Sequence, residues 1–254
     1  MKKKKINSNN LLLLITIVLF FVMYAAGCIV YADKGFTRFQ TFLNILINNA
    51  GLICITAGMT CVMLTGGIDI SVGSVVGLVG MLAGGMIQEG ITLKFAGVTL
   101  YFSVPVIVIA MLIIGCLIGA VNGLIVTKLG VAPFIATLGT MYICRGFANL
   151  RSNGATFSDI KGYDGLGNTG FKILGSNIAG IPTGVYIFVV LAVIAVVILK
   201  KLPFGWYVLA VGGNEKSARL SGIKADKIKI IVYMISGFCA AWVGMINTAQ
   251  LSAA

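Results

Sequence analysis

The stretch that decides the fold runs from residue 200 to residue 229 and reads KKLPFGWYVLAVGGNEKSARLSGIKADKIK. It carries seven of the nineteen Lys and Arg residues and lies between two long apolar segments. Asn214 is a favourable N-cap, Glu215 follows where the helix dipole favours an anion, and Gly222 suits the left-handed turn that ends many helices. The sequence therefore predicts a short helix of about two turns, roughly 12 Å long.

Two interpretations of this short helix follow from the residues alone. Helices of about two turns are marginal in water and usually persist because they dock on something, which favours a docking element. Basic loops between membrane spans are also ordinary topology signals that only fix orientation. Both interpretations require that the flanking apolar segments cross a membrane.

The composition requires a membrane protein. Of 254 residues, 59% are apolar and only 10% are charged, too apolar a balance for a soluble chain of this length. The sequence predicts an all-α, polytopic helical membrane protein. The net charge of +12 does not indicate nucleic acid binding, because the basic residues flank apolar segments and form no face of a soluble domain.

Several classes of chemistry are excluded by residue type. The chain has no histidine, which excludes His-based catalysis and removes the commonest metal ligand. The six cysteines show no C-x-x-C pairing, lie in apolar segments, and are interpreted as small buried hydrophobes. No Walker A sequence and no nucleophile elbow is present. We expect neither an enzyme nor a cofactor or metal bound by this chain.

Seven apolar stretches approach the length needed to cross a bilayer core of about 30 Å. They run over residues 11–31, 43–64, 71–88, 103–127, 133–150, 183–200 and 228–250. An N-terminal lipoprotein signal ending before Cys28 is disfavoured, because the apolar run continues past it.

The distribution of Lys and Arg predicts the orientation. With the N-terminus inside, twelve basic residues fall on cytosolic segments and seven on outer ones. Residues 1–10 are then a basic cytosolic N-terminus, and residues 11–254 form a single transmembrane domain. Within that domain the 200–229 loop is cytosolic. The 151–182 loop is outside, where it covers span ends or meets a partner.

The segment TGGIDISVGS at residues 65–74 interrupts the apolar pattern between the second and third stretches. The glycine pair can end one helix, and Asp69 or Ser71 can cap the next. A carboxylate at a break between spans can instead mark a substrate or ion path. The residues of this predicted break are Gly66, Gly67, Asp69, Ser71 and Gly73.

Other polar and small residues within the spans suggest further roles. Asn44 and Asn48 share a helix face by their i, i+4 spacing and are candidates for a translocation path. Such residues also commonly supply hydrogen bonds between helices. The GxxxGxxxG run of Gly115, Gly119 and Gly123 predicts close helix packing.

Three blocks of the sequence resemble a known family. TGGIDISVGS at 65–74, VAPFIATLGTMYICRG at 131–146 and FGWYVLAVGGNEKSARLSGIKADKIKIIVYMISGF at 204–238 are similar to permease subunits of ribose-type ABC sugar importers. Ribose permeases look closest, followed by galactose, xylose and autoinducer permeases. The resemblance covers nearly the whole chain and implies a location in the bacterial plasma membrane.

The resemblance implies that the loop helix is a coupling helix that docks in a cleft of a cytosolic ABC ATPase. Lys216 stands where importer permeases carry an acid, so that equivalence is loose. The implied coupling residues are Gly212, Gly213, Asn214, Glu215, Ala218, Arg219, Leu220, Ser221 and Gly222. The further implied partners are an extracytoplasmic sugar-binding protein and a second permease copy, with ATP and Mg²⁺ bound by the ATPase.

One departure from the family leaves alternatives open. Family members continue with further spans beyond the residues matching the stretch that ends at Ala254, which leads us to expect a truncated chain. The first hypothesis is a monosaccharide permease driven by a separate ATPase. The others are an ion-coupled secondary transporter that uses Asp69, and a non-transporting membrane scaffold.

Overall fold

The computed structural model describes residues 8–93, 97–163, 165, 167–178 and 181–251. The chain divides into two compact units, Met1–Asn48 and Asn49–Ala254. The predicted basic N-terminus at Lys2–Lys5, the outer Lys94 and the final residue Ala254 lie outside the described residues.

The first unit consists of an apolar helix, a short turn and the start of a second helix. Helix α1 spans Ser8–Val30, a short 3-10 helix spans Ala32–Lys34, and helix α2, Phe39–Leu64, begins in this unit. Gly35 takes a φ of 71°, the left-handed region that favours glycine, and closes the 3-10 turn. The hydroxyl of Thr41 donates to the Gly35 carbonyl at 2.9 Å and fixes the start of α2.

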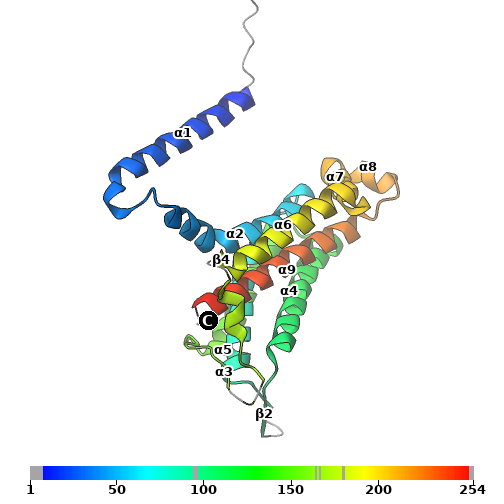
Figure 1. Cartoon of the computed structure of the whole chain (residues 1–254). Helices are drawn as coiled ribbons and strands as arrows, with labels where there is room; N and C mark the ends of the chain where they lie inside the picture. The colour runs from blue at the N-terminus through cyan, green and yellow to red at the C-terminus, as the bar shows by residue number, and fades with distance from the viewer. Residues whose placement is uncertain (1–7, 94–96, 164, 166, 179–180, 252–254) are drawn as a thin grey trace, which may run out of the picture. The chain divides into compact units, whose positions relative to one another are not determined.

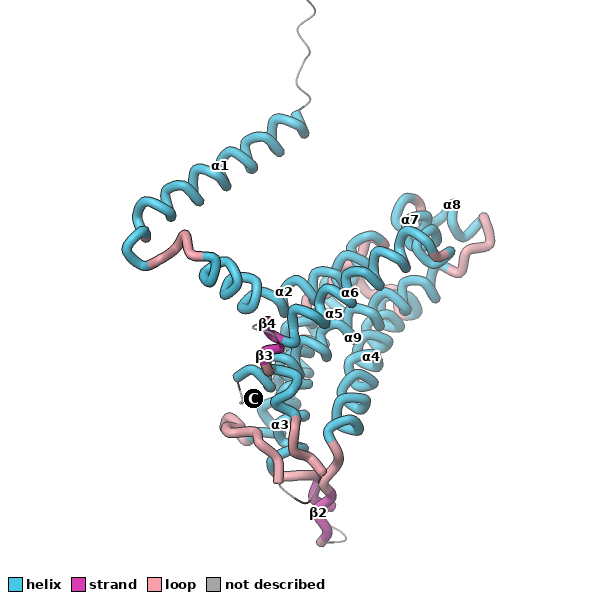
Figure 2. The backbone as a smooth tube through the Cα atoms, viewed as in Figure 1, coloured by secondary structure: helices cyan, strands magenta, loops and turns pink. Residues whose placement is uncertain are grey.

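The second unit continues α2 and holds the remaining elements, which Figures 1 and 2 show in order along the chain. Its long helices are α3 (Val72–Gln88), α4 (Val104–Lys128), α5 (Pro133–Ser152), α6 (Thr183–Lys201) and α9 (Ala225–Leu251). Two shorter helices, α7 (Pro203–Gly213) and α8 (Glu215–Leu220), stand between α6 and α9. The strands form two antiparallel hairpins, β1 (Ile91–Leu93) with β2 (Val98–Leu100) and β3 (Asn177–Ile178) with β4 (Ile181–Pro182).

All seven predicted apolar stretches are helical, and the all-α class is confirmed. Within the described residues, α1, α4, α6 and α9 are long and apolar enough to cross a membrane. Helix α2 adds a fifth span if its two parts, Phe39–Ile45 and Asn48–Leu64, count as one. Helix α3 has 17 residues, or about 26 Å, which is short for a bilayer core of about 30 Å. Helix α5 carries Arg145 and Arg151 near its end.

Helix α9 forms the centre of the second unit and packs along α4 and α3 (Figure 2). The glycines of the α4 run make this possible, since a Cβ at Gly119 would come closer than 3.0 Å to the backbone of Tyr233. A Cβ at Gly115 would meet the Gly237 carbonyl, and one at Gly123 would meet the backbone of Ile230. The close packing predicted from the GxxxGxxxG run is confirmed.

The 200–229 loop holds one more helix than the sequence indicated. Helix α7 occupies 203–213, with Pro203 at its first turn. It packs against the end of α2 at Gly212, where a Cβ would clash with the Leu64 carbonyl. Its apolar run is too short to be recognised as a span, and the flanking Pro and Gly residues are typical of a loop.

The second unit has two opposite ends. Helices α7 and α8 lie at one end and the β1–β2 hairpin at the other (Figure 1). Within the described part of the 151–182 loop, the Asn168 amide donates to the Ile87 carbonyl at 2.9 Å and Phe171 is buried. This contact shows the loop covering span ends, one of its two predicted roles.

Candidate functional site

The first candidate region is the break between α2 and α3. Helix α2 ends at Leu64, and the amides of Gly66 and Gly67 fold back to the carbonyls of Met63 and Val62. Gly66 takes a φ of 74°, so the predicted termination by the glycine pair is confirmed. The Tyr233 hydroxyl of α9 donates to the Ile68 carbonyl at 3.2 Å and holds the break against that helix.

Asp69 is the most deeply buried carboxylate among the described residues, with 3% of its surface exposed. One carboxylate oxygen accepts the Ser71 amide at 3.1 Å and the Ser71 hydroxyl at 2.6 Å. The other accepts the Ser236 hydroxyl of α9 at 2.8 Å. Ser236 lies about 16 Å along α9 from Ala225, so the carboxylate sits well inside the span rather than at its end.

The hydrogen bonds extend from Asp69 into two more helices. The Asn122 amide of α4 donates to the Ser71 hydroxyl at 2.9 Å, and the Thr140 hydroxyl of α5 donates to the Asn122 carbonyl oxygen at 2.5 Å. The hydrogen bonds therefore run in series from Thr140 through Asn122 and Ser71 to Asp69. We call Asp69, Ser71, Asn122, Thr140 and Ser236 the break network.

The break network confirms a capping role for Asp69, whereas the place of this carboxylate on a substrate or ion path stays a prediction. Ser71 is the N-cap of α3 but makes no side-chain capping bond, whereas Asp69 accepts the Ser71 amide just before the helix. The same carboxylate also joins α9, which a local cap does not require. The predicted Gly73 stands apart from the network, since nothing lies within 4 Å of the Cβ it lacks.

The second candidate region is helix α8 with its flanking turns. Its predicted limits are confirmed: the Asn214 side chain accepts the Ser217 amide at 3.0 Å, and Gly222 takes a φ of 84°. Ala218 is buried in an apolar cluster with residues of α2, α7 and α9, whereas Leu220 is 91% exposed. The helix is thus anchored by one face and presents an apolar side chain on the other.

An ionic cluster joins α8 to two long helices. The Arg219 guanidinium donates to Glu215 at 2.7 Å and also to Asp226 in the first turn of α9. Lys229 of α9 pairs with Glu215, and Lys128 at the end of α4 pairs with Asp226 at 3.2 Å. Hydrogen bonds from Lys229 and then Arg219 hold the pKa of the Glu215 carboxyl below its ordinary value. We call these five residues the α8 ion cluster.

The remaining predicted loop residues take backbone roles. Gly212 allows the close approach to α2 described above, and Gly213 ends α7. The Ser221 hydroxyl donates to the Ser217 carbonyl at 3.0 Å and closes the last turn of α8.

The predicted path residues Asn44 and Asn48 lie in the first unit. The Asn44 side chain accepts a hydrogen bond from the Gln40 amide at 3.1 Å. This bond joins neighbours on one helix and bears neither on a translocation path nor on contacts with another helix. Their place on such a path stays a prediction.

Sequence reasoning missed the partners of both regions. Asn122, Thr140 and Ser236 are polar residues in apolar helices, a visible signal, but nothing in the sequence pairs them with Asp69. The Glu215–Arg219 pair has the readable i, i+4 spacing, whereas Lys128 and Asp226 meet across 98 positions of sequence.

The chemistry of both regions is that of binding and positioning. The serine hydroxyls of the break network donate to a carboxylate, and no histidine exists to activate them. Over the described ranges, no group of three or more Cys, Asp or Glu side chains is placed to hold a metal ion.

Comparison with known proteins gives the family. Residues 41–254 match the family described as the permease component of the branched-chain amino acid transport system. The ribose import permease of Bacillus subtilis is 40% identical over 228 residues, covering 87% of this chain and 64% of the relative. That of Haemophilus influenzae is 38% identical over 226 residues, covering 87% and 65%. No solved structure gives a significant match.

Other sugar permeases are also similar. The galactose/methyl galactoside import permease of Haemophilus influenzae is 34% identical over 241 residues, covering 92% of this chain and 70% of the relative. The chain spans about 65% of the length of the ribose permeases it matches. The chain belongs to the family of permease components matched by residues 41–254, and it is a multi-pass protein of the bacterial plasma membrane.

Proposed function

We propose that this chain is the transmembrane permease subunit of an ABC importer that moves a monosaccharide, with ribose as the first candidate. The observation that carries the proposal is the 37–40% identity to ribose import permeases over 87% of the chain. Galactose and fructose permeases at 34–35% identity favour the wider class of monosaccharides. An extracytoplasmic binding protein would deliver the sugar, and a second permease copy would complete the pore.

Helix α8 is the proposed contact with a cytosolic ABC ATPase, which would bind ATP and Mg²⁺. Its capped ends fix a short rigid segment, and Ala218 anchors one side of it. Leu220, at 91% exposure in a charged loop, supplies an apolar side chain for a partner pocket. The fully buried core of a protein interface is more apolar than its rim.

The α8 ion cluster connects the proposed ATPase contact to the spanning helices α4 and α9. Asp226 and Lys229 hold α8 to the start of α9, and Lys128 adds α4. Further along α9, Ser236 holds the break network. In this proposal, α9 transmits a movement of α8 to the break between α2 and α3. It can do so because one continuous helix carries both the ion pairs to α8 and the hydrogen bond to Asp69.

Uptake measurements test the transport function. The chain would be produced with its ATPase and binding protein in bacteria lacking their own ribose permease, and uptake of labelled ribose, galactose and fructose compared. We expect ATP-dependent uptake of one of these sugars. Uptake that persists without the ATPase and collapses with the ion gradient would instead establish the ion-coupled alternative, in which Asp69 is the ion-binding group.

Photocrosslinking tests the docking helix. A photoreactive amino acid at position 220 is expected to capture the ATPase subunit. The matched control is the same amino acid at Thr92, an exposed residue of β1 at the opposite end of the second unit. Equal capture from both positions, or capture from position 92 alone, would contradict docking on α8.

A further inference from the structure

An open pocket of about 390 Å³ lies beside α8, where α4 ends and α9 begins. Its walls carry four cationic side chains, Lys128, Arg219, Lys224 and Lys227, and one carboxylate, Asp226. Gly222 also lines the pocket, and nothing lies within 4 Å of the Cβ it lacks. The pocket is therefore both strongly positive and accessible.

The charges of the pocket are only partly compensated by the protein. Asp226 already accepts from Arg219 and from Lys128. Lys224 and Lys227 are exposed, and within the described part of the chain neither forms an ion pair. The N-terminus of α9 adds the partial positive charge of the helix dipole at the same place. An anion with several acceptor oxygens fits these donors.

The position of the pocket identifies the source of that anion. Lys128 ends α4 and Lys227 lies in the first turn of α9, two helices long and apolar enough to span the bilayer. The ends of spanning helices lie at the level of the lipid headgroups, and basic pockets between such ends bind anionic lipids. The long lysine stems allow the ammonium groups to reach the headgroup layer.

We propose that this pocket binds the phosphate of an anionic phospholipid headgroup. The phosphate oxygens accept from Lys224 and Lys227 and share the Lys128 and Arg219 donors with Asp226. The bound lipid then offsets the repulsion among four neighbouring cations and holds the ends of α4 and α9 together. This function does not depend on which solute the chain transports.

The test uses the purified full chain in neutral detergent, without any partner protein, so that membrane surface potential is absent. Phosphatidylglycerol and phosphatidylcholine are added separately, and retained lipid is counted by native mass spectrometry while the thermal midpoint is measured. We expect retention of phosphatidylglycerol, with a raised midpoint, in preference to phosphatidylcholine. The double variant K224Q/K227Q is expected to lower apparent affinity about 10- to 30-fold, from about 1 kcal/mol per basic residue.

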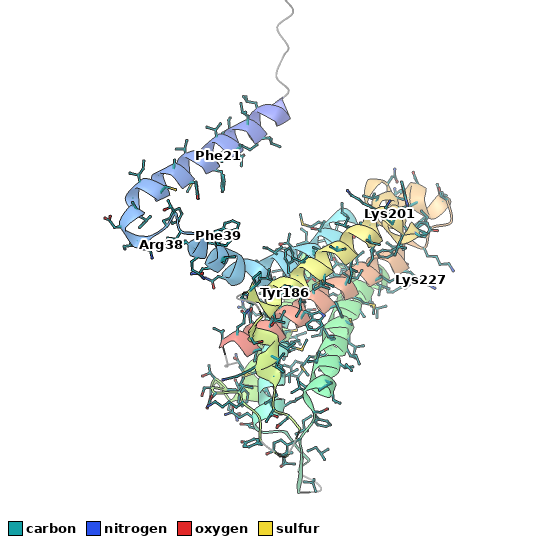
Figure 3. The ribbon with its side chains drawn as sticks, in the orientation of Figure 1. Phe21, Arg38, Phe39, Tyr186, Lys201 and Lys227 are labelled. Atoms are coloured by element: carbon teal, nitrogen blue, oxygen red, sulfur yellow. The ribbon has the colours of Figure 1, made fainter. Side chains whose placement is uncertain are left out.

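The matched control is K200Q/K201Q, which removes the same charge from the same end of the second unit. Lys201 and Lys227 both lie at that end but on different helices (Figure 3). The control should retain phosphatidylglycerol as the unchanged chain does. Equal loss in both variants would show general charge attraction and overturn the site.

A separate arm identifies the source of the phosphate. Inorganic phosphate alone should raise the midpoint less than phosphatidylglycerol. If inorganic phosphate protects the chain and phosphatidylglycerol does not, the pocket binds a soluble anion and the lipid assignment is wrong. If neither phosphatidylglycerol nor inorganic phosphate binds, the lipid assignment is wrong. Loss of ATPase capture by K224Q/K227Q in the separate photocrosslinking experiment would then assign the basic surface to the protein partner. None of these outcomes depends on sugar uptake, so the lipid-binding results can be interpreted even if the transport test fails.

Discussion

The break network and the α8 ion cluster both centre on a carboxylate, but they lie in opposite environments. Asp69 is 3% exposed and is bonded to hydroxyls and a backbone amide, whereas the Glu215 side chain is 36% exposed and is bonded to cations. Asp69 accepts hydrogen bonds from uncharged donors, whereas Glu215 forms ion pairs with Arg219 and Lys229. A carboxylate thus accepts hydrogen bonds from neutral groups of the protein within the spans, and forms solvent-exposed ion pairs at their end.

The physical reason for the difference is the cost of leaving a group without a partner. Inside the spans no water replaces a lost hydrogen bond, so each donor and acceptor must be satisfied by the protein. At the end of the spans water and salt compete with every ion pair, and exposed pairs contribute little stability. Substitutions should therefore have larger effects in the break network than in the α8 ion cluster.

Asp69→Ala is expected to have the largest effect. It removes the acceptor of two hydroxyls and one amide, and leaves those donors buried without a partner. The expected loss of unfolding free energy is about 2–4 kcal/mol, measured by denaturant titration in detergent.

The control for this substitution is Ser236→Ala, which removes one donor and leaves Asp69 with two hydrogen bonds from Ser71. Its expected cost is about 1 kcal/mol. An equal loss in the two variants would mean that Asp69 is no more than one hydrogen-bonding group among several.

Asn122→Leu should have the next largest effect, about 1–2 kcal/mol. The change is close to isosteric, and the Thr140 hydroxyl can turn to the Ala136 carbonyl, which it already approaches at 3.2 Å. Ser71 loses its donor but keeps its bond to Asp69. The measurement is the same denaturant titration, and a loss larger than that of Asp69→Ala would place the centre of the network on α4 instead.

The two regions also differ in how well the sequence predicted them. The N-cap of α8 and its left-handed Gly222 were both predicted, because caps act locally, through a hydrogen bond three positions away between Asn214 and Ser217. The break after Leu64 was predicted for the same reason, from Gly66 and Gly67. Local chemistry of this kind can be read from neighbouring residues.

The tertiary partners could not be predicted in this way. Asp69 and Ser236 are 167 positions apart, and their contact depends on α9 packing along α3 and α4. The glycines of α4 indicated that some helix packs closely there, but the partner α9 emerged only from the structure. Single polar residues in apolar helices identify candidates for such a network without stating which ones pair.

Asn214→Ala is expected to act locally rather than globally. Loss of the cap costs about 1 kcal/mol, enough to loosen a helix of about two turns. Hydrogen exchange should speed up over residues 215–221 while α9 is unchanged. Asn214→Ser is the matched control, because serine also caps helices well. Faster exchange in both variants would mean that the Asn214 side chain does more than cap.

The smallest effects should come from salt and pH, and they separate the two regions most cleanly. Raising NaCl to about 1 M shortens the screening length to about 3 Å, so hydrogen exchange over α8 should rise while exchange around the break is unchanged.

The pKa of Glu215 is lowered in the folded chain. Its contribution to stability is therefore present above the unfolded pKa of about 4.3 and is lost as pH falls through the lower folded pKa. Between pH 7 and pH 5, corrected exchange over α8 should therefore stay constant. A loss of protection within that range would require a titrating group other than Glu215, and salt sensitivity at the break would mean that water reaches Asp69.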